Sequence, residues 1–282
     1  MDFIKMHGLG NDFVCLDRFL DPAENNPAET DYSELAQRLC HRQLGIGGDG
    51  LLLILPSEKA DARMRIFNAD GSEPEMCGNG IRCFARYIYE QGYVQKDQLT
   101  VETLAGIKPI RLQMKDGRVY GVTVDMGKPR LSAKEIPVND HSDRVVNKRL
   151  EVLGKEIGIT AVSVGNPHCV LFLDDFAETD VLAVGAALEK HPFFPAKTNV
   201  EFVRVDSGEE ITVKVWERGV GPTLACGTGA CASVVAAVLN GRTGRRLTVH
   251  LPGGDLQIEY AEEGRILMTG PAQYVFRGQL ID

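Results

Sequence analysis

Hydrophobic residues alternate with polar ones along most of the chain, between clusters of glycine, asparagine and aspartate. This period of two is typical of half-buried β-strands, and the clusters are typical of turns. Asp116-Gly117 separates two such segments and predicts a β-hairpin. We expect short strands within residues 3–16, 51–55, 64–67, 99–102, 110–114, 119–124, 150–152, 157–164, 169–173, 200–205, 211–216, 247–251, 256–260, 266–268 and 274–276.

Two segments in the first half of the chain follow the helical period of 3.6 residues. Residues 33–42 place Leu35 and Leu39 on one face. A second helix is expected to stop at Gly92, because glycine is common just after a helix. Its inner face is predicted to consist of Ile81, Phe84, Ala85 and Ile88.

Two further helices are predicted in the second half. Thr179 is the expected N-cap residue of one, which ends near Lys190. Its inner face is predicted to consist of Val181, Leu182, Val184, Gly185 and Leu188. The other helix, residues 230–239, is apolar on every side. Such a helix must be buried all round, as it would be by a sheet curled around it.

Three polar or glycine-rich stretches are expected to be irregular. Residues 21–31 predict a surface loop, and residues 128–147, which contain two prolines, predict the connection between two halves of the chain. Residues 44–50 are rich in glycine but lead into a strand and lack a Gly-Lys-Ser/Thr ending, so they do not predict a phosphate-binding loop. The pattern as a whole is that of a strand-rich α+β protein.

One motif occurs twice. Cys77-Gly78-Asn79-Gly80 and Cys226-Gly227-Thr228-Gly229 each lead into a predicted helix. The upstream residues repeat as well: Asn68 and Glu217 lie nine positions before their cysteines (77 − 68 and 226 − 217). Gly50 lies 27 positions before Cys77, as Asn199 does before Cys226. Two copies with the same spacing indicate a duplicated unit of about 150 residues rather than a solenoid.

A cysteine at the start of a helix lies where backbone N–H groups are unpaired and the helix dipole is positive. This environment lowers a thiol pKa from about 8.5 to roughly 3.5–7.5. Two such cysteines suggest a thiolate and a thiol that act as base and acid on opposite faces of one carbon. The carbanion formed next to a carboxylate would be stabilised by the N–H groups of the two helix N-termini.

Composition narrows the classes of function. The chain has 282 residues, 44% of them hydrophobic, and a formal net charge of −8, which argues against a nucleic-acid surface. No run of 18 apolar residues and no signal peptide is evident, so no membrane association is expected. Seven cysteines without a signal fit a reducing cytoplasm. No Cys-x-x-Cys and no cofactor motif occurs, so neither a metal nor a cofactor is expected.

At these residues the sequence resembles the diaminopimelate epimerase family, from residue 6 to residue 272. The motifs that carry the resemblance are His7-Gly8-Leu9-Gly10-Asn11-Asp12-Phe13, Phe67-Asn68-Ala69-Asp70-Gly71-Ser72, the two Cys-Gly-x-Gly motifs, Gly165-Asn166-Pro167-His168, Glu217-Arg218-Gly219, Leu251-Pro252-Gly253-Gly254 and Met268-Thr269-Gly270-Pro271-Ala272.

The resemblance implies an α+β fold of two pseudo-symmetric halves, each a barrel-like, mostly antiparallel sheet around a central helix. The last strand is expected to return to the first half, so that residues 1–121 with 273–282 carry Cys77 and residues 122–272 carry Cys226. It also implies cofactor-independent interconversion of LL- and meso-2,6-diaminopimelate in the cleft between the halves, a role in lysine and peptidoglycan precursor biosynthesis, and a homodimer.

The resemblance also implies the roles of individual residues. Cys77 and Cys226 are expected to be the two acid/base residues. His168 and Glu217 are expected to hold the ammonium group or to tune the thiols. The expected substrate contacts are Asn11, Asn68, Gly78, Asn79, Asn166, Asn199, Glu217, Arg218, Gly227 and Thr228. Arg218 suits the distal carboxylate because a guanidinium binds a carboxylate through two hydrogen bonds.

Gly50 departs from the pattern, because many family members have glutamine there and its side chain contacts the substrate. We predict altered substrate affinity and the same reaction.

Other classes of function remain open from the sequence. A proline racemase or hydroxyproline epimerase also transfers a proton with two cysteines but would not need Glu217 and Arg218. A carbon–carbon isomerase would not need both thiols, a thiol redox protein would have a vicinal cysteine pair, and a binding module would need neither cysteine.

Overall fold

Segments with the alternating pattern form strands throughout the protein. The computed structural model describes residues 1–20 and 30–281. It divides into two units, one made of Met1–Asp125 with Thr269–Asp282 and the other of Met126–Met268. The division lies four residues from each expected boundary, 121/122 and 272/273.

Unit 1 is a mixed sheet with helices in two of its connections. Its elements are β1 (Asp2–Gly8), β2 (Asn11–Asp17), α1 (Tyr32–Cys40), β3 (Gly50–Leu55), β4 (Ala62–Asn68), α2 (Gly78–Glu90), β5 (Gln98–Thr103), β6 (Gly106–Lys115), β7 (Arg118–Gly127) and β17 (Gln273–Gln279). β2 and β3 are parallel and joined through α1, as β4 and β5 are through α2. The pairs β1–β17, β1–β2, β3–β4, β5–β6 and β6–β7 are antiparallel.

Unit 2 repeats this arrangement. Its elements are β8 (Lys148–Val152), β9 (Lys155–Ser163), β10 (Pro167–Phe172), the 3-10 turn η1 (Phe176–Glu178), α3 (Val181–Glu189), β11 (Asn199–Val205), β12 (Glu210–Glu217), β13 (Gly221–Thr223), α4 (Gly227–Leu239), β14 (Arg246–Leu251), β15 (Gly254–Tyr260) and β16 (Ile266–Gly270). β10 and β11 are parallel and joined through α3, as β12 and β14 are through α4. The pairs β8–β9, β9–β10, β11–β12 and β14–β15 are antiparallel.

The two units correspond residue by residue, and not only in the order of their elements. Phe13 of β2 pairs with Gly50 of β3, and His168 of β10 pairs with Asn199 of β11. Gly50 and Asn199 each lie 27 residues before the cysteine that begins the next central helix, Cys77 or Cys226. Phe13 and His168 are therefore equivalent positions. The spacing that suggested a duplication corresponds to matching strand registers.

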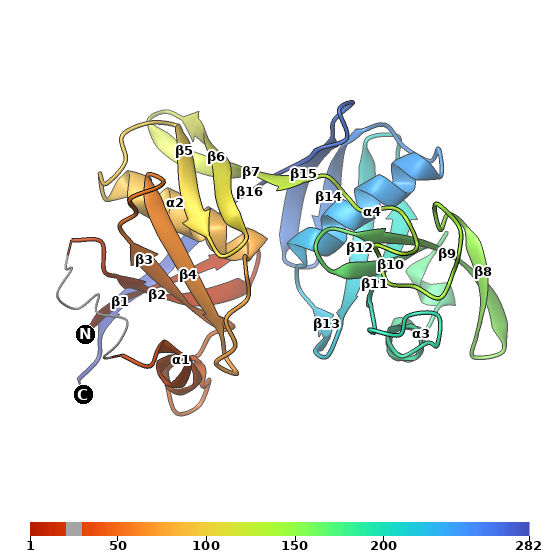
Figure 1. Ribbon diagram of the computed structural model, residues 1–282, viewed down its shortest axis with the longest axis horizontal. Coiled ribbons are helices and arrows are strands. Elements are labelled where there is room, and N and C mark those ends of the chain that lie inside the picture. Colours follow the sequence, from red (N-terminus) through yellow and green to blue (C-terminus); the bar gives the residue numbers. More distant parts are fainter. Residues whose placement is uncertain (21–29, 282) are drawn as a thin grey trace. The chain divides into compact units, whose positions relative to one another are not determined.

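Each unit surrounds one helix with its sheet (Figure 1). In unit 1, α2 packs against β1, β3, β4 and β6. In unit 2, α4 packs against β9, β10, β11, β12, β14 and β15. Ten of the thirteen residues of α4 are buried, which agrees with its all-round apolar sequence. The predicted α+β architecture of two similar halves, each a sheet around a central helix, is confirmed.

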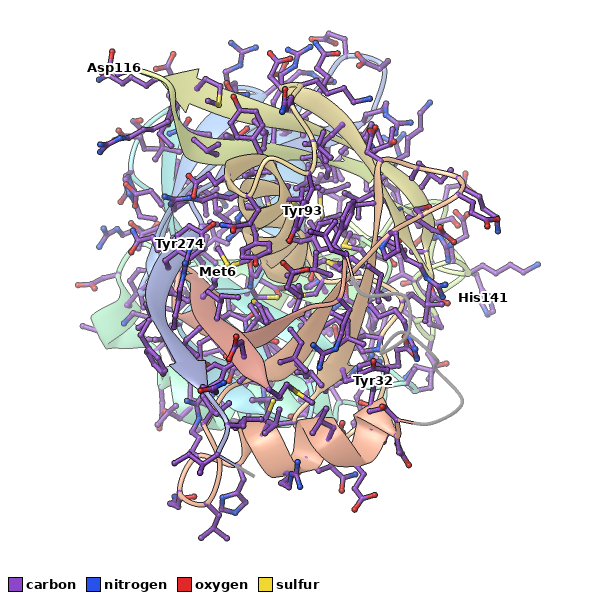
Figure 2. All side chains as sticks on the ribbon, turned by 90° about the vertical axis from the view of Figure 1, so that its left-hand side faces the viewer. Met6, Tyr32, Tyr93, Asp116, His141 and Tyr274 are labelled. Carbon is purple, nitrogen blue, oxygen red and sulfur yellow. The ribbon has the colours of Figure 1, made fainter. Side chains whose placement is uncertain are left out.

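The C-terminal strand completes the sheet of unit 1. β17 runs antiparallel to β1, so that Tyr274 pairs with Met6 (Figure 2), and the amide of Leu280 donates to the carbonyl oxygen of Met1 at 2.8 Å. Phe3 of β1 and Phe276 of β17 meet edge to face at 5.9 Å between ring centroids. The expected return of the last strand to the first half is therefore present.

Three local predictions need comment. The N-cap of α3 is Asp180, not Thr179, because the Asp180 carboxylate accepts the N–H groups of Leu182 and Ala183. Leu182 therefore lies in the first turn on the exposed side of the helix and not on its inner face.

The predicted connection, residues 128–147, instead contributes apolar side chains to the core of unit 2: Ala133, Ile136, Val138 and Val145. Residues 21–29 of the predicted surface loop lie outside the described residues.

Candidate active site

Cys77 is the N-cap residue of α2. Its backbone is extended, and its Sγ accepts the N–H of Gly80 at 3.4 Å, as a capping side chain does. The sulfur lies 3.9 Å from Oδ1 of Asn11 on β2. Cys77 is partly exposed. The thiol predicted to react is therefore held at the start of a helix and remains accessible within unit 1.

An amide network surrounds Cys77. Asn11 Oδ1 accepts from Asn79 Nδ2 at 3.0 Å, and Asn11 Nδ2 donates to Asp49 Oδ2 at 2.7 Å. The buried Arg82 donates from Nη1 to the carbonyl oxygen of Gly78 at 3.1 Å and to Asn79 Oδ1 at 3.0 Å. These bonds fix both ends of each amide, so the expected contacts Asn11, Gly78 and Asn79 are brought together with the thiol.

Asp12, next to Asn11, holds this loop through two ion pairs. Its carboxylate lies 2.7 Å from Lys5 Nζ and 2.9 Å from an Arg42 nitrogen. Burial by itself would raise the pKa of Asp12, but hydrogen bonds from Arg42 and Lys5 and their charges lower it to about 2. Arg42 also pairs with Asp49 at 2.8 Å, so the Asn11 amide is tied to a charged network.

Asn68 and Gly50 lie on the neighbouring strands of unit 1. They pair across β3 and β4, and the exposed Asn68 side chain donates to Ser72 Oγ at 2.9 Å. A Cβ at Gly50 would lie only 2.8 Å from the carbonyl oxygen of Phe67. A side chain at this position therefore requires a shift of β4, which the sequence did not reveal.

Cys226 caps α4 in the same way, and Gly229 N donates to its Sγ at 3.4 Å. Its surroundings differ, because burial raises the pKa of Cys226 well above the usual thiol value and the negative charges of Glu217 and Glu201 raise it further. Hydrogen bonds from Thr228 and the Gly229 amide only partly oppose this rise. The predicted lowering of the thiol pKa is therefore wrong for Cys226 in this structure, since burial and two carboxylates outweigh the helix terminus.

His168 is fully buried on β10 between two oxygen atoms. Its Nδ1 lies 2.7 Å from Glu201 Oε1 on β11, and its Nε2 lies 2.9 Å from Asn166 Oδ1. Burial raises the pKa of Glu201, although the charge and hydrogen bond of His168 act in the opposite direction. The expected residues Asn166 and His168 are thus joined, together with a carboxylate that the sequence-based assignment did not include.

The remaining expected residues of unit 2 lie at the ends of neighbouring strands. Asn199 Nδ2 donates to the carbonyl oxygen of Pro167 at 2.9 Å, and Asn199 Oδ1 accepts the backbone N–H of Arg218 at 2.9 Å. The exposed Arg218 side chain donates a hydrogen bond from Nη1 to the carbonyl oxygen of Ala196 at 3.1 Å. Glu217 accepts a hydrogen bond from Thr223 Oγ1 at 2.6 Å. Asn199 therefore fixes the backbone that carries both charged side chains.

The five other cysteines are buried among apolar side chains: Cys15, Cys40, Cys83, Cys169 and Cys231. Burial raises the pKa of Cys40 to about 11 and that of Cys83 to about 12. Cys77 and Cys226 differ from these five thiols in position, because each is the N-cap residue of a central helix, and they remain the two candidates for proton transfer.

The sequence-based assignment missed the supporting residues Asp49, Arg82 and Glu201. One signal was present for Glu201, since a single carboxylate interrupts the apolar run of strand 200–205. Among residues 1–20 and 30–281, no group of three or more His, Cys, Asp or Glu side chains is placed to hold a metal ion. Within the same residues, no helix is long and apolar enough to cross a membrane.

Comparison with solved structures identifies the fold. A probable proline racemase from Agrobacterium radiobacter matches with a TM-score of 0.70 at 18% identity, covering 100% of this chain and 93% of that one. A hydroxyproline epimerase from Agrobacterium vitis, bound to trans-4-hydroxy-L-proline, matches with a TM-score of 0.69 at 17% identity, covering 99% and 90%. The protein has the fold of these amino-acid racemases and epimerases.

The sequence then selects the family. The family model for diaminopimelate epimerase matches residues 3–132 and 160–275. The diaminopimelate epimerase of Desulfitobacterium hafniense is 64% identical over 283 residues, covering 100% of this chain and 99% of the relative. That of Heliobacterium modesticaldum is 55% identical over 282 residues, covering 99% of both. The chain belongs to the diaminopimelate epimerase family, and it is therefore an isomerase.

Proposed function

We propose that this protein interconverts LL-2,6-diaminopimelate and meso-2,6-diaminopimelate by proton transfer between two cysteines, without a cofactor. The observation that carries this proposal is the matched pair of helix tips. Cys77 and Cys226 each cap a central helix, and each sulfur accepts the N–H of the third residue beyond it at 3.4 Å. Family membership supplies the substrate.

The reaction follows from this chemistry. One cysteine, as a thiolate, removes the α-hydrogen of one stereocentre as a proton, and the C–H electron pair moves into the adjacent carboxylate. The other cysteine, as a thiol, then donates its proton to the opposite face of the same carbon. The configuration is inverted, and the two cysteines have exchanged their protonation states. Atoms and charge balance, and the reverse reaction uses the same steps with the roles exchanged.

The helix N-termini stabilise the charge that develops on the reacting carboxylate. In α2 the N–H groups of Gly78 and Asn79 are among the four that lack a helical partner, and Gly227 and Thr228 hold the same positions in α4. Preorganised donors of this kind contribute roughly 3–4 kcal/mol each where they have been removed in other enzymes. Neutral backbone donors suit a group whose negative charge increases during the reaction.

The remaining residues recognise the ends of a doubly zwitterionic substrate. We assign Arg218 to the distal carboxylate, because its guanidinium is exposed and, among the described residues, gives one hydrogen bond to the carbonyl oxygen of Ala196. We assign Asn11, Asn68, Asn166 and Asn199 to the ammonium and carboxylate groups. Glu217 and His168 are the residues assigned to an ammonium group or to the tuning of the thiols, and the effect of Glu217 on the pKa of Cys226 supports the second role.

A proline-type substrate is the alternative. The likeness to proline racemase and hydroxyproline epimerase is one of fold, at 18% and 17% identity. A cyclic amino acid with one carboxylate would leave the Arg218 guanidinium without a second carboxylate to bind. The match of the whole chain to diaminopimelate epimerases favours the longer substrate.

Heavy-water exchange tests the proposal directly. Reduced protein, with no added cofactor, is given meso-diaminopimelate in D2O, and α-carbon deuterium is followed by NMR together with the appearance of the LL isomer. We expect both signals from the wild type and neither from Cys77→Ala or Cys226→Ala. Cys83→Ala is the matched control, because Cys83 is buried on the same helix and is expected to keep the activity. Folded, reduced wild-type protein without exchange would refute the proposal, and L-proline would be tested next.

The biological setting follows from the substrate. We place the reaction in lysine and peptidoglycan precursor biosynthesis, and in the cytoplasm, where a reducing environment keeps thiols free. Cys15, Cys40, Cys83, Cys169 and Cys226 form no disulfide in the structure, which supports this placement.

We also propose a homodimer. Val275 and Phe276 of β17 are 53% and 47% exposed, although both are large and apolar, and a second copy of the chain would cover them. Sedimentation of Phe276→Asp tests this. A dimeric wild type and a monomeric variant are expected, and a monomeric wild type at micromolar concentration would refute it.

A further inference from the structure

A buried carboxylate holds the turn that carries Glu217 and Arg218. Glu189 is the last residue of α3, and it is only 4% exposed. Its Oε2 accepts the indole N–H of Trp216 at 2.8 Å, and its Oε1 accepts the backbone N–H of Gly219 at 3.2 Å. These two donors lie on either side of Glu217 and Arg218 in the sequence. One carboxylate therefore fixes both ends of the segment that carries the two charged side chains.

Glu189 also holds the loop that contacts the Arg218 guanidinium. Its backbone carbonyl oxygen accepts the N–H of Thr198 at 3.3 Å, and Lys197 Nζ lies 3.9 Å from its Oε1. Ala196, the preceding residue, accepts a hydrogen bond from Arg218 Nη1 at 3.1 Å. The turn that carries the guanidinium and the loop that the guanidinium contacts are therefore both bonded to Glu189.

The helix is shaped to bring the indole to this carboxylate. Gly185 lies four residues before Glu189, on the same face of α3. A Cβ added at Gly185 would lie 2.9 Å from the Trp216 ring atoms Cγ and Cδ2. The indole therefore rests directly on the backbone of α3, and a larger residue at this position would push its N–H away from Glu189.

Glu189 holds both donors as an ionised carboxylate. The hydrogen bond from Trp216 lowers the pKa of Glu189 below its usual value, burial acts in the opposite direction, and the Gly219 N–H and the charge of Lys197 lower it further. An ionised carboxylate accepts at both oxygens, whereas an amide of the same size has one acceptor oxygen and a donating NH2 group. Glutamine at position 189 would therefore leave either the indole N–H or the Gly219 N–H without its acceptor.

The equivalent position of unit 1 is a thiol. The two helix-tip cysteines are 149 positions apart (226 − 77), and α1 and α3 are separated by the same number at both ends (181 − 32 and 189 − 40). Glu189 therefore corresponds to Cys40, and Arg218 corresponds to the uncharged Ala69 (218 − 69). The buried carboxylate thus accompanies the turn that carries an arginine, and a buried thiol takes its place where the turn carries an alanine.

We propose that Glu189 is a positioning residue for substrate recognition: it holds the turn around Arg218 so that the guanidinium meets the distal carboxylate of the substrate. This inference rests on the proposed function, which gives Arg218 that carboxylate to bind. Glu189 acts through Arg218, because its own oxygens are occupied by Trp216 and Gly219. A guanidinium binds a carboxylate through two parallel hydrogen bonds, which need a fixed orientation. Misplacement by about 1 Å can reduce a rate by about 100-fold, even when its cause lies far from the reacting atoms.

Steady-state kinetics in a double-mutant cycle test the proposal. In Glu189→Gln we expect the KM for LL-diaminopimelate to rise about tenfold or more, with a smaller change in kcat, because a hydrogen bond to a charged group is lost. Arg218→Ala should raise KM further. The combined variant should be no worse than Arg218→Ala alone, because Glu189 then has no guanidinium to position. Glu156→Gln, which removes an exposed carboxylate from β9 of the same unit, is the control and should keep the wild-type KM.

Hydrogen exchange of the substrate-free protein, followed by NMR, gives a second readout. The Gly219 amide should exchange about tenfold faster or more in Glu189→Gln, while the amides of β11 keep their wild-type rates and show that unit 2 is folded. Glu189→Asp, which keeps the charge on a side chain one methylene shorter, should move both readouts in the same direction and replaces the glutamine variant if that variant does not fold.

Three results would each overturn the proposal: an unchanged Gly219 exchange rate, an unchanged KM, or losses that multiply in the combined variant. The last result would show that Glu189 acts on the reaction by a route other than Arg218. A wild type that does not turn over diaminopimelate would instead refute the proposed function, and the exchange rate of the Gly219 amide would still decide whether Glu189 holds the turn.

Discussion

Replacing the equivalent glycines Gly229 and Gly80 with alanine should give unequal losses of stability. Both lie in the first turn of a helix, where alanine is favoured over glycine by roughly 0.5–1 kcal/mol. At Gly80 the new methyl group meets the ends of flexible side chains, Ile66 Cδ1 at 3.1 Å and Leu52 Cδ1 at 3.4 Å. These can move by a few tenths of an ångström, so the free energy of unfolding should change by less than about 1 kcal/mol.

At Gly229 the methyl group would lie 2.7 Å from Glu201 Oε1, which is buried and hydrogen-bonded to His168. The carboxylate must move away from the imidazole, and leaving a buried hydrogen-bonding group unsatisfied costs about 1–3 kcal/mol. After the gain in helix propensity, Gly229→Ala should lower the free energy of unfolding by about 1–2 kcal/mol.

Urea unfolding measures the difference. The single tryptophan, Trp216, lies on β12, so its fluorescence reports unit 2, while far-UV circular dichroism reports both units. Gly229→Ala should shift the fluorescence transition to lower urea concentration, and Gly80→Ala should leave it in place. Equal shifts for the two variants, or no shift for Gly229→Ala, would show that Glu201 is free to move and would refute the reasoning.

Three further predictions follow from the site. Asp12→Asn should lower the free energy of unfolding by about 2 kcal/mol at neutral pH and make it depend less on acid pH. Burial raises the pKa of Asp12, but its two cationic partners outweigh burial and lower the folded pKa to about 2, so the stabilisation present above the unfolded value of 3.8 is lost as pH falls through 2. Unfolding measured between pH 2 and 7 checks this. Gly50→Gln should change the Michaelis constant for diaminopimelate without changing the reaction, and should lower the melting temperature; an unchanged constant would remove this position from substrate recognition. Mild oxidation should join Cys77 to Cys226 and abolish activity, with recovery in a thiol reductant; full activity of an oxidised sample with both thiols blocked would contradict a catalytic role.

The periodicity of hydrophobic residues and the residues typical of turns were sufficient to predict much of the fold. The alternating segments became strands because one face of each is buried, and the all-apolar α4 could only be central. The 27-residue spacing of Gly50 and Asn199 from their cysteines also corresponded to a shared strand register. The N-cap at Asp180 was missed because Thr179, the residue before it, is also a common cap residue, and the geometry shows which of the two caps the helix.

The charged surroundings of the thiols were not predictable in the same way. The general rule that a helix terminus lowers a thiol pKa omits burial, which depends on contacts between distant strands. Glu201 reaches Cys226 only because β11 packs against α4, and no local pattern states that contact. The polar segment 128–147 was mistaken for a connection for a related reason, since its four core residues are scattered among polar ones without a helical or strand period.

The pairing of β17 with β1 means that unit 1 is discontinuous in the chain and unit 2 is not. During synthesis from the N-terminus, every strand of unit 2 leaves the ribosome before β17 does. Unit 2 can therefore complete its sheet while unit 1 still has an open edge at β1, which only the last residues close. The two chain ends also lie side by side, as the bond from Leu280 to Met1 shows. A circular permutant of this chain that starts at Thr269 and links residue 282 to Met1 would make each unit one uninterrupted segment, and would allow unit 1 to fold first.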